Sequence, residues 1–513
     1  MASIKKLDTF LGKFSVQSTL LKISEESRQL FASGSPFKNI SFSKNRISAS
    51  TMVTQWGLAF LCCRAILVSN DGRSDRFQLN DLGYASYLFN DLDEPFLEDS
   101  DVLGFFGRIS QEQFSWQNIS SYDFARNYAL LVEMPRKIHE NYADNELEIN
   151  LSSVFKKIFS LSIEEYIAIA FVIFAKSTDS SAFNSQDIKV DENIKSKEVF
   201  TEEKISAFLE NTSASYQEIR ALQKDINRVT YVGYERYEFN PLTKFPIVKS
   251  DNRYLYSRKY NFVIPHIGML LRKMTGGVYW ELRDYFSKQK SRSFLHDFGI
   301  LFEQYVGEIL KSYFGSQNVE RLEIRKGINS KKHADWLVKL DRLILIFECK
   351  SSLMPLLTRQ TFNKFSLLKW MNEVFIKGST QLDASELEFR QSERFDGQKI
   401  CKFLVTFEDL YFAEEDLFRS FWNTEIKERK GKEKDFYHIS VRDLELLEKP
   451  IQEIGMSEII NKKEEVDALN AIRDGRGILS VARKMKNFNQ LDNEHLSIIY
   501  RKFFESFLGL PNL

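Results

Sequence analysis

The chain has few of the residues that interrupt helices. Its 513 residues include only 9 prolines and 22 glycines, whereas phenylalanine occurs 44 times. Proline and glycine destabilise helix interiors and phenylalanine is usually buried, so this composition favours long, buried helices. The apolar fraction of 43% and the charged fraction of 28% exclude a disordered or fibrous chain. The length exceeds what one hydrophobic core covers, and we expect two or three domains.

Cysteines and long apolar runs are also scarce. The spacing of Cys62, Cys63, Cys349 and Cys401 fits neither a zinc site nor a disulfide framework, which favours a reduced, cytoplasmic protein. The best apolar run, residues 166–175, is about half of the roughly 20 residues that a spanning helix needs. The N-terminus lacks the apolar core of a signal peptide. We therefore expect no membrane association.

Neither sign of charge is in excess, because the formal net charge is zero. The whole chain is therefore not drawn to nucleic acid by its charge. The distribution is uneven, however: residues 91–150 hold 4 Lys/Arg and 13 Asp/Glu, whereas residues 321–380 hold 12 and 5. A locally basic segment is expected where one domain meets phosphate, although a solvated basic face gives the same count.

The pattern of elements predicts an α+β multidomain protein. Residues 1–228 are expected to form a helical domain, in which Ser162 and Glu165 form a capping box and Thr201 caps a helix running to about residue 228. Residues 177–200 are polar and predict a linker or a long loop. Residues 229–290 predict a small β-containing connector, with a hairpin of residues 245–248 and 253–256.

Residues 291–410 predict an α/β core, and residues 411–513 a helical C-terminal extension with an exposed loop at 425–435. Within the core we expect a helix at 294–314 and strands at 319–324, 334–338 and 343–350. A helix at 362–383 and a strand at 402–407 follow. The helical domain contains no catalytic motif. Scaffolding, substrate guidance, self-association and binding of a partner protein all remain open for it.

The chemistry is expected in residues 333–352. A symmetric hairpin centred between Asp341 and Arg342 places Asp335 directly opposite Glu348, with Cβ atoms about 4.5–5.5 Å apart. Two carboxylates this close repel each other unless a cation lies between them, and hard oxygen ligands suit Mg²⁺ or Mn²⁺. Lys350 shares their face by strand alternation and could orient a metal-activated water or stabilise developing negative charge. The alternative is an exposed strand end with a surface ion pair.

Asp335, a twelve-residue gap and then Glu348-Cys349-Lys350 resemble the signature of the PD-(D/E)XK nuclease superfamily. The order of helix, three strands, helix and strand is similar to its restriction-endonuclease-like fold. The resemblance covers about residues 294–410, and Ala334 stands where the family name has proline. It implies Mg²⁺-dependent hydrolysis of phosphodiester bonds. Proteins that join such a core to a large helical half also resemble prokaryotic defence nucleases, although this step is analogy.

The resemblance further implies a helix glutamate as an additional ligand and a Lys/Gln pair in the later helix, to which Lys377 and Gln381 correspond. Two glutamates compete for the ligand position, and a peripheral ion pair is the alternative role for Glu303. Glu303 lies at the edge of the buried stripe of its helix, whereas Glu308 projects about 140° further round and is expected to be a solvated surface residue.

We therefore expect the following site. The catalytic residues are Asp335, Glu348, Lys350, Glu303 and Gln381, and the metal ligands are Asp335, Glu348, Glu303 and the backbone carbonyl of Cys349. The expected nucleic-acid contacts are Arg325, Lys326, Lys331, Lys332 and Lys377. His333 either faces the site or lies on the surface.

These residues predict a metal-dependent endonuclease that cuts DNA. Replacement of Asp335, Glu348 or Lys350 by alanine is expected to abolish cleavage and to leave the fold intact. Two alternatives remain: a nuclease that cuts RNA, and a binding or regulatory protein that keeps the nuclease fold without cutting.

Overall fold

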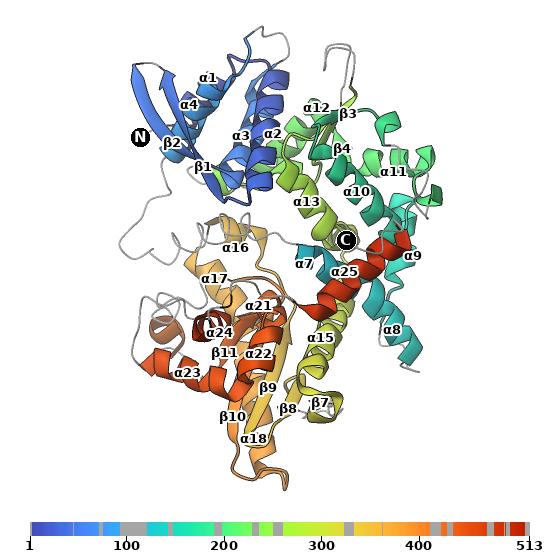
Figure 1. The fold of residues 1–513 in the computed structure, drawn as a ribbon, viewed down its shortest axis with the longest axis vertical. Helices are drawn as coiled ribbons and strands as arrows, with labels where there is room; N and C mark the ends of the chain where they lie inside the picture. Colours follow the sequence, from blue (N-terminus) through green and yellow to red (C-terminus); the bar gives the residue numbers. More distant parts are fainter. Residues whose placement is uncertain are drawn as a thin grey trace.

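The computed structural model shows a mixed α+β protein (Figure 1). It describes residues 3–44, 46–70, 75–92, 121–141, 147–188, 197–227, 235–249, 260–322, 333–361, 363–410, 422–427, 434–468, 477–486, 488 and 493–507. Within these ranges the strands form three sheets of two, five and four strands.

The five-stranded sheet carries the expected site. Its strands are β7 (Val319–Arg321), β8 (Trp336–Lys339), β9 (Leu343–Lys350), β10 (Lys399–Thr406) and β11 (Tyr437–Ser440). They lie in the order β11-β10-β9-β8-β7, in which β7, β8 and β9 are antiparallel neighbours and β9, β10 and β11 run parallel. β7 to β10 match the predicted strands within a few residues. β11 was not predicted, and it brings a segment of the expected helical extension into the sheet.

Helices cover both faces of this sheet. Alternate residues of β9 divide between two hydrophobic clusters: Leu345 and Phe347 pack with helix α15, whereas Ile344 and Ile346 pack with helices α17 and α18. The helix predicted at 294–314 is confirmed as α15 (Ser293–Phe314). The one predicted at 362–383 is longer and is interrupted, consisting of α17 (Lys364–Met371), a π-helical turn η9 (Asn372–Ile376) and α18 (Lys377–Gln391).

The first 228 residues are less uniformly helical than predicted. β1 (Phe37–Lys44) and β2 (Ile47–Thr54) form an antiparallel hairpin. Thr201 caps α11 as expected, but this helix ends at Thr212 rather than near residue 228. The Thr212 and Ser213 hydroxyls donate to carbonyls one turn back, and Ser215 and Glu218 bond each other's backbone N–H to begin α12 (Tyr216–Asn227). These side-chain bonds compete with helix continuation.

The connector forms part of a third sheet, of order β3-β6-β5-β4. Its strands are β3 (Ala182–Phe183), β4 (Ser213–Ala214), β5 (Ile247–Lys249) and β6 (Phe262–Val263). β5 matches the first half of the predicted hairpin, and its antiparallel partner is β6. The second predicted strand, at residues 253–256, lies outside the described residues, as does most of the predicted loop at 425–435.

The remaining helices up to residue 288 are α1 (Ile4–Leu11), α2 (Val16–Ser33), α3 (Gln55–Val68), α4 (Leu79–Asn90), α7 (Ser121–Tyr128), α8 (Met134–Asn141), α9 (Leu151–Phe159), α10 (Ile163–Ser177), α13 (Ile267–Thr275) and α14 (Gly277–Lys288). Of these, α1 to α4 lie together in the upper part of Figure 1. The later ones are α16 (Leu356–Thr361), α21 (Val441–Glu445), α22 (Glu448–Ile454), α23 (Met456–Ala468), α24 (Ile478–Lys486) and α25 (Glu494–Phe507), and α21 to α24 lie near β11.

Buried side chains of α7 to α10 belong to the same hydrophobic cluster as α15, whereas those of α1 to α4 form another with β5, β6 and α13. In the described ranges, no helix by itself has both the length and the apolar character of a membrane span. The bent pair α9 and α10, which meet at 56°, passes that test only when joined.

Candidate metal centre

The β8–β9 hairpin has the predicted register. Trp336 pairs with Phe347 and Lys339 with Ile344, so the turn falls at Asp341 and Arg342. The Leu340 N–H donates to the Leu343 carbonyl at 2.9 Å, which closes a two-residue turn. Asp335 comes immediately before β8, one residue beyond the last pair, and its N–H donates to the Phe347 carbonyl. It lies near enough to Glu348, close to the end of β9, for the charge of Glu348 to act on it. The predicted register of the hairpin is thus confirmed from Trp336 to Lys339.

Asp335 is held in place by the end of β9. Its Oδ2 accepts a hydrogen bond from the Cys349 backbone N–H at 2.7 Å, and its own N–H donates to the Phe347 carbonyl at 3.0 Å. Burial raises the pKa of the Asp335 carboxyl well above its ordinary range, and the nearby carboxylates of Glu348 and Glu303 raise it further. The negative charge of Asp335 is thus costly in this position unless a cation accompanies it.

Glu348, Lys350 and Gln381 form one hydrogen-bonded chain. The Glu348 side chain is 2% exposed, and its Oε1 accepts from the Lys350 Nζ at 2.5 Å. Lys350 also donates to the Oε1 of Gln381 at 2.8 Å, and the Gln381 amide donates to the His333 carbonyl at 3.1 Å. Gln381 therefore ties α18 to β9 and to the segment before β8, and it helps to fix the position of the Lys350 ammonium.

Gly378 is a site residue that sequence reasoning missed. A Cβ at this position would lie 2.5 Å from Leu404 Cδ1, 3.3 Å from Lys350 Cε and 3.6 Å from Glu348 Cγ. The contact with Leu404 is the one that a Cβ would not allow, so glycine lets α18 lie this close to β10 and, with it, beside Lys350 and Glu348. An isolated glycine inside a predicted helix is a signal of such a close approach, so this residue could have been found.

Glu303 and Glu308 differ in their surroundings, and Glu303 forms the ion pair that was its alternative role. Glu303 acts on Asp335 through its charge, and its Oε1 accepts from the Arg321 Nε at 2.7 Å. Glu308 bonds Lys137 at 3.3 Å and Lys311 at 3.4 Å, and its side chain is 35% exposed. It is thus paired with α8 rather than simply solvated, which corrects part of the prediction. Its ion pairs with lysines lower its pKa despite partial burial.

The predicted nucleic-acid contacts and His333, where the structure describes them, form no ion pair with the two carboxyl groups. Lys377 is exposed and forms an ion pair with Glu373, one turn away on the same helix. Arg325, Lys326, Lys331 and Lys332 lie outside the described residues. The His333 side chain is mostly buried, so it is not a surface residue. Its ring contacts Glu388 at 3.2 Å. Among the described residues, it makes no hydrogen bond to Asp335 or Glu348.

The donor set suits a hard cation. Burial and the Asp335 carboxylate raise the pKa of the Cys349 thiol well above its ordinary range, which disfavours the thiolate that a soft metal would need. Carboxylate and carbonyl oxygens are then the donors at this end of the sheet, and Mg²⁺ and Mn²⁺ prefer oxygen ligands.

A second acidic group lies elsewhere on α15. Ligand atoms of Glu148, His296 and Asp297 lie within 4.8 Å of one another, and within the described ranges this is the one trio of His, Cys, Asp or Glu side chains so close together. Both Asp297 oxygens, however, accept backbone N–H groups, from Glu148 at 3.0 Å and from Ile149 at 2.8 Å. Asp297 thus has a structural role in anchoring the segment before α9.

Comparisons of the chain with protein-family models, with curated proteins and with solved structures find no match.

Proposed function

We propose that the chain is a metal-dependent nuclease of the restriction-endonuclease-like class, with Asp335, Glu348 and Lys350 at its centre. One observation carries this proposal. The hairpin register brings two carboxyl groups together at a strand end, where burial and mutual repulsion raise the pKa of Asp335. Folding this arrangement costs free energy, and a bound divalent cation would offset that cost.

The topology supports the same proposal. Helix α15, the antiparallel strands β7 to β9, helices α17 and α18, and the parallel strand β10 follow one another in the order of that fold, with helices on both faces of the sheet. Fold-level likeness is analogy, however, and the weight lies on the site residues.

In this proposal Asp335, Glu348 and the Cys349 carbonyl hold Mg²⁺ or Mn²⁺, and Glu303 acts on the ion directly or through water. The bound ion would acidify a water molecule and stabilise charge on the scissile phosphate. Lys350 places its ammonium beside Glu348 and is kept there by Gln381, so it is positioned to bind a phosphate oxygen or to orient the attacking water. We propose DNA as the substrate.

The test is cleavage by the purified full chain of single-stranded and duplex DNA and RNA, with Mg²⁺, Mn²⁺ or EDTA. We expect cleavage of DNA that requires the metal and is lost in Asp335→Asn and Glu348→Gln. Glu308→Gln is the control, because Glu308 lies on the same helix as Glu303 but is paired away from the site. Metal-dependent cleavage of RNA alone would support the RNA nuclease. Binding without cleavage would support the regulatory protein.

A further inference from the structure

The solvent face of the helical segment beside the site carries an exposed aromatic ring and lysines. Phe365 is 79% exposed, the most exposed large hydrophobic side chain of the described residues. Lys369 and Lys377 on the same segment are also exposed. The segment then continues to Gln381, which bonds Lys350 of the proposed site.

The π-helical turn η9 aligns these side chains. In an uninterrupted α-helix each residue advances by about 100°, so Lys377 would lie about 120° around the axis from Phe365. A π-bulge adds one residue without advancing the face, which reduces this offset to roughly 20°. Phe365, Lys369 and Lys377 thereby form one stripe, which we call the outer stripe. Leu367, Trp370 and Leu382 point the other way, into the hydrophobic cluster.

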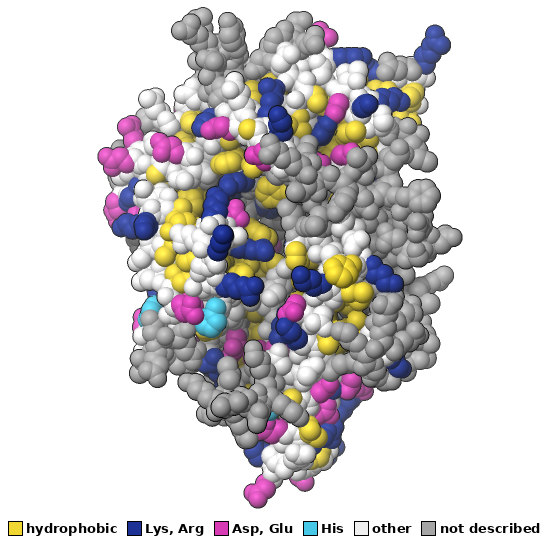
Figure 2. Space-filling view, turned by 180° about the vertical axis from the view of Figure 1, so that it is seen from behind, with side chains coloured by type: hydrophobic (Ala, Val, Ile, Leu, Met, Phe, Trp, Pro, Cys, Tyr) yellow, Lys and Arg dark blue, Asp and Glu magenta, His cyan; other side chains and the backbone are white. Residues whose placement is uncertain are grey.

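The charge on and around the outer stripe suits phosphate. Lys369, Lys377 and Lys350 all act on Glu373 through their charges, which shows that they surround this one carboxylate. Lys350 is already paired with Glu348, and Lys377 with Glu373, so Lys369 is the member of this group that adds positive charge to the outer stripe. Figure 2 shows Lys and Arg side chains, mixed with hydrophobic and a few acidic ones, around the middle of the face seen from behind.

We propose that the outer stripe guides a single strand of nucleic acid to the metal centre and that Phe365 stacks on one of its bases. This inference rests on the proposed function and adds the substrate's form. At a rise of about 1.5 Å per residue, about 24 Å of helix separates Phe365 from Gln381. A stacked strand rises about 3.4 Å per nucleotide, so Phe365 meets a base about seven nucleotides from the site.

Unpaired bases explain why the ring is exposed and flanked by lysines. A base in a duplex has both faces covered by its neighbours, whereas an unpaired base offers a face to an aromatic side chain. Proteins that bind single strands combine such rings with a basic path for the backbone. An apolar partner surface would instead require neighbouring apolar side chains, and Asn363, Lys364 and Lys369 are exposed polar neighbours of Phe365.

The experiment measures binding of the full chain in EDTA, where cleavage does not occur. The probes are fluorescein-labelled 16-nucleotide single strands of DNA and RNA, a 16-base-pair duplex, and single strands that carry 2-aminopurine. Phe365→Ala is compared with Phe365→Trp, which keeps a stacking ring. The matched control is Leu387→Ala, because Leu387 is a 52% exposed apolar residue of α18 beyond Gln381. Thermal unfolding checks that the exposed substitutions leave the fold intact.

We expect Phe365→Ala to weaken binding of a single strand about tenfold, with the duplex little affected, because stacking on an aromatic ring contributes substantially to each contacted base. Quenching of 2-aminopurine should be lost in Phe365→Ala and kept in Phe365→Trp. Weaker binding of single-stranded DNA, of single-stranded RNA or of both supports the outer stripe and shows which nucleic acid it binds. The proposal is overturned if Phe365→Ala binds a single strand within twofold of the affinity of Leu387→Ala. It is also overturned if Phe365→Ala weakens binding of the duplex as much as binding of the single strand.

The two proposals fail in different ways. If cleavage is metal-dependent but binding is indifferent to Phe365→Ala, the outer stripe is wrong and the nuclease stands. If single strands bind in a manner that depends on Phe365 but no metal supports cleavage, the proposed function is wrong and the stripe stands.

Discussion

At the level of single side chains, Lys350 stabilises a buried charge as well as serving the proposed chemistry. Glu348 is almost fully buried beside it. Lys350→Ala should therefore destabilise the protein by about 3 kcal/mol at neutral pH, because it leaves a buried carboxylate without its cation. This differs from the expectation, based on sequence alone, that the substitution leaves the fold intact. The free energy of unfolding in urea measures the effect, and adding Glu348→Gln should recover most of it. A double variant no more stable than Lys350→Ala would contradict the argument.

The raised pKa of Asp335 makes stability depend on pH. The Asp335 carboxyl binds its proton more tightly in the folded chain than in the unfolded one. Its contribution to the free energy of unfolding is therefore fully present below its pKa in the unfolded chain, and it is lost as the pH rises through its pKa in the folded chain. In EDTA the wild type should lose up to about 1.4 kcal/mol per pH unit across that window. Asp335→Asn should lack this decline, because an amide does not titrate. The fold should be kept, since the amide oxygen can still accept the Cys349 N–H. Parallel urea midpoints from pH 4 to pH 8 would refute the assignment.

Glu303 and Glu308 give a comparison within one helix. Glu303 lies in the electrostatic field of Asp335, whereas Glu308 is paired with lysines of α8 and α15. Glu303→Gln should require a several-fold higher Mg²⁺ concentration for half-maximal cleavage, and Glu308→Gln should match the wild type. The titration of cleavage rate against Mg²⁺ separates them. The opposite ranking would place the metal on the other side of α15.

At the level of elements, the distance between α18 and β9 depends on one glycine. Gly378→Ala would place a Cβ against Leu404 and Lys350 and push α18 from the sheet, at a cost of about 1–3 kcal/mol. Cleavage should fall as well, because Gln381 moves with the helix. Gly299→Ala in α15 is the control: its Cβ meets only Ser351 Oγ at 3.7 Å. The control should gain up to about 1 kcal/mol from helix propensity. Equal unfolding temperatures for the two variants would argue against close packing at Gly378.

The elements that sequence predicts well are those whose cause is local. The polar pair Asp341 and Arg342 interrupts an apolar run, so the β8–β9 register and the meeting of Asp335 with Glu348 could be deduced from period-two alternation. The break after Thr212 also has a local cause, because Ser215 and Glu218 form a capping box that begins α12, and this signal was missed. The break at η9 could not be deduced, because propensity alone continues that helix. β11 has four residues and pairs only with β10, from which it is distant in sequence. Such a strand depends on tertiary contacts and leaves no periodic signal.

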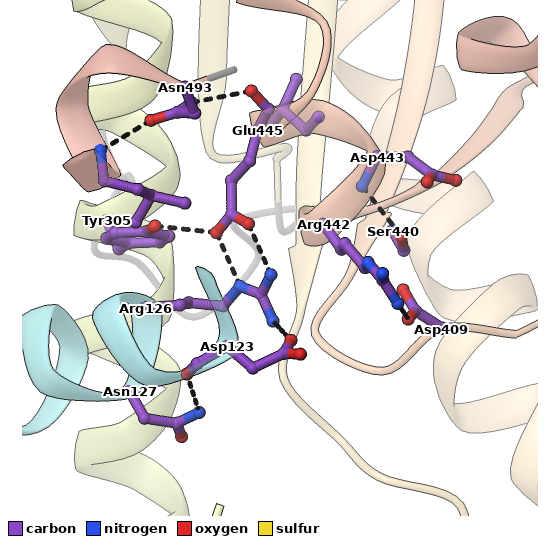
Figure 3. A network of polar contacts seen from close by, with 12 residues as sticks. Asp123, Arg126, Asn127, Tyr305, Asp409, Ser440, Arg442, Asp443, Glu445 and Asn493 are labelled. Carbon is purple, nitrogen blue, oxygen red and sulfur yellow. Dashed lines mark hydrogen bonds and ion pairs between the residues drawn. The ribbon is translucent and has the colours of Figure 1, made fainter. Parts of the chain in front are cut away.

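At the level of the whole molecule, segments distant in sequence meet around one buried ion pair. Helix α7 packs against α25, where the rings of Phe124 and Phe503 lie 4.9 Å apart. Beside them, the Arg126 guanidinium donates to both oxygens of Glu445 at 2.6 and 2.5 Å (Figure 3). The Tyr305 hydroxyl of α15 donates to the same carboxylate at 2.8 Å. The Glu445 side chain of α21 thus connects α7 and α15, and its backbone carbonyl accepts from the Asn493 amide just before α25 at 2.7 Å.

This connection predicts how loss of Arg126 affects the whole chain. Arg126→Met leaves the buried Glu445 carboxylate with the Tyr305 hydroxyl as its remaining hydrogen-bond partner among the described side chains, and the uncompensated charge should cost about 3–5 kcal/mol of unfolding free energy. Arg126→Met with Glu445→Leu should recover much of this loss, since a buried ion pair can be replaced by apolar side chains at little cost.

Arg394→Met is the control, because Arg394 and Glu320 form an ion pair between side chains that are 47% and 46% exposed. Exposed pairs contribute less than about 1 kcal/mol. Urea unfolding measures all three variants. If Arg126→Met costs no more than Arg394→Met, the two halves are held together by apolar packing and not by this network.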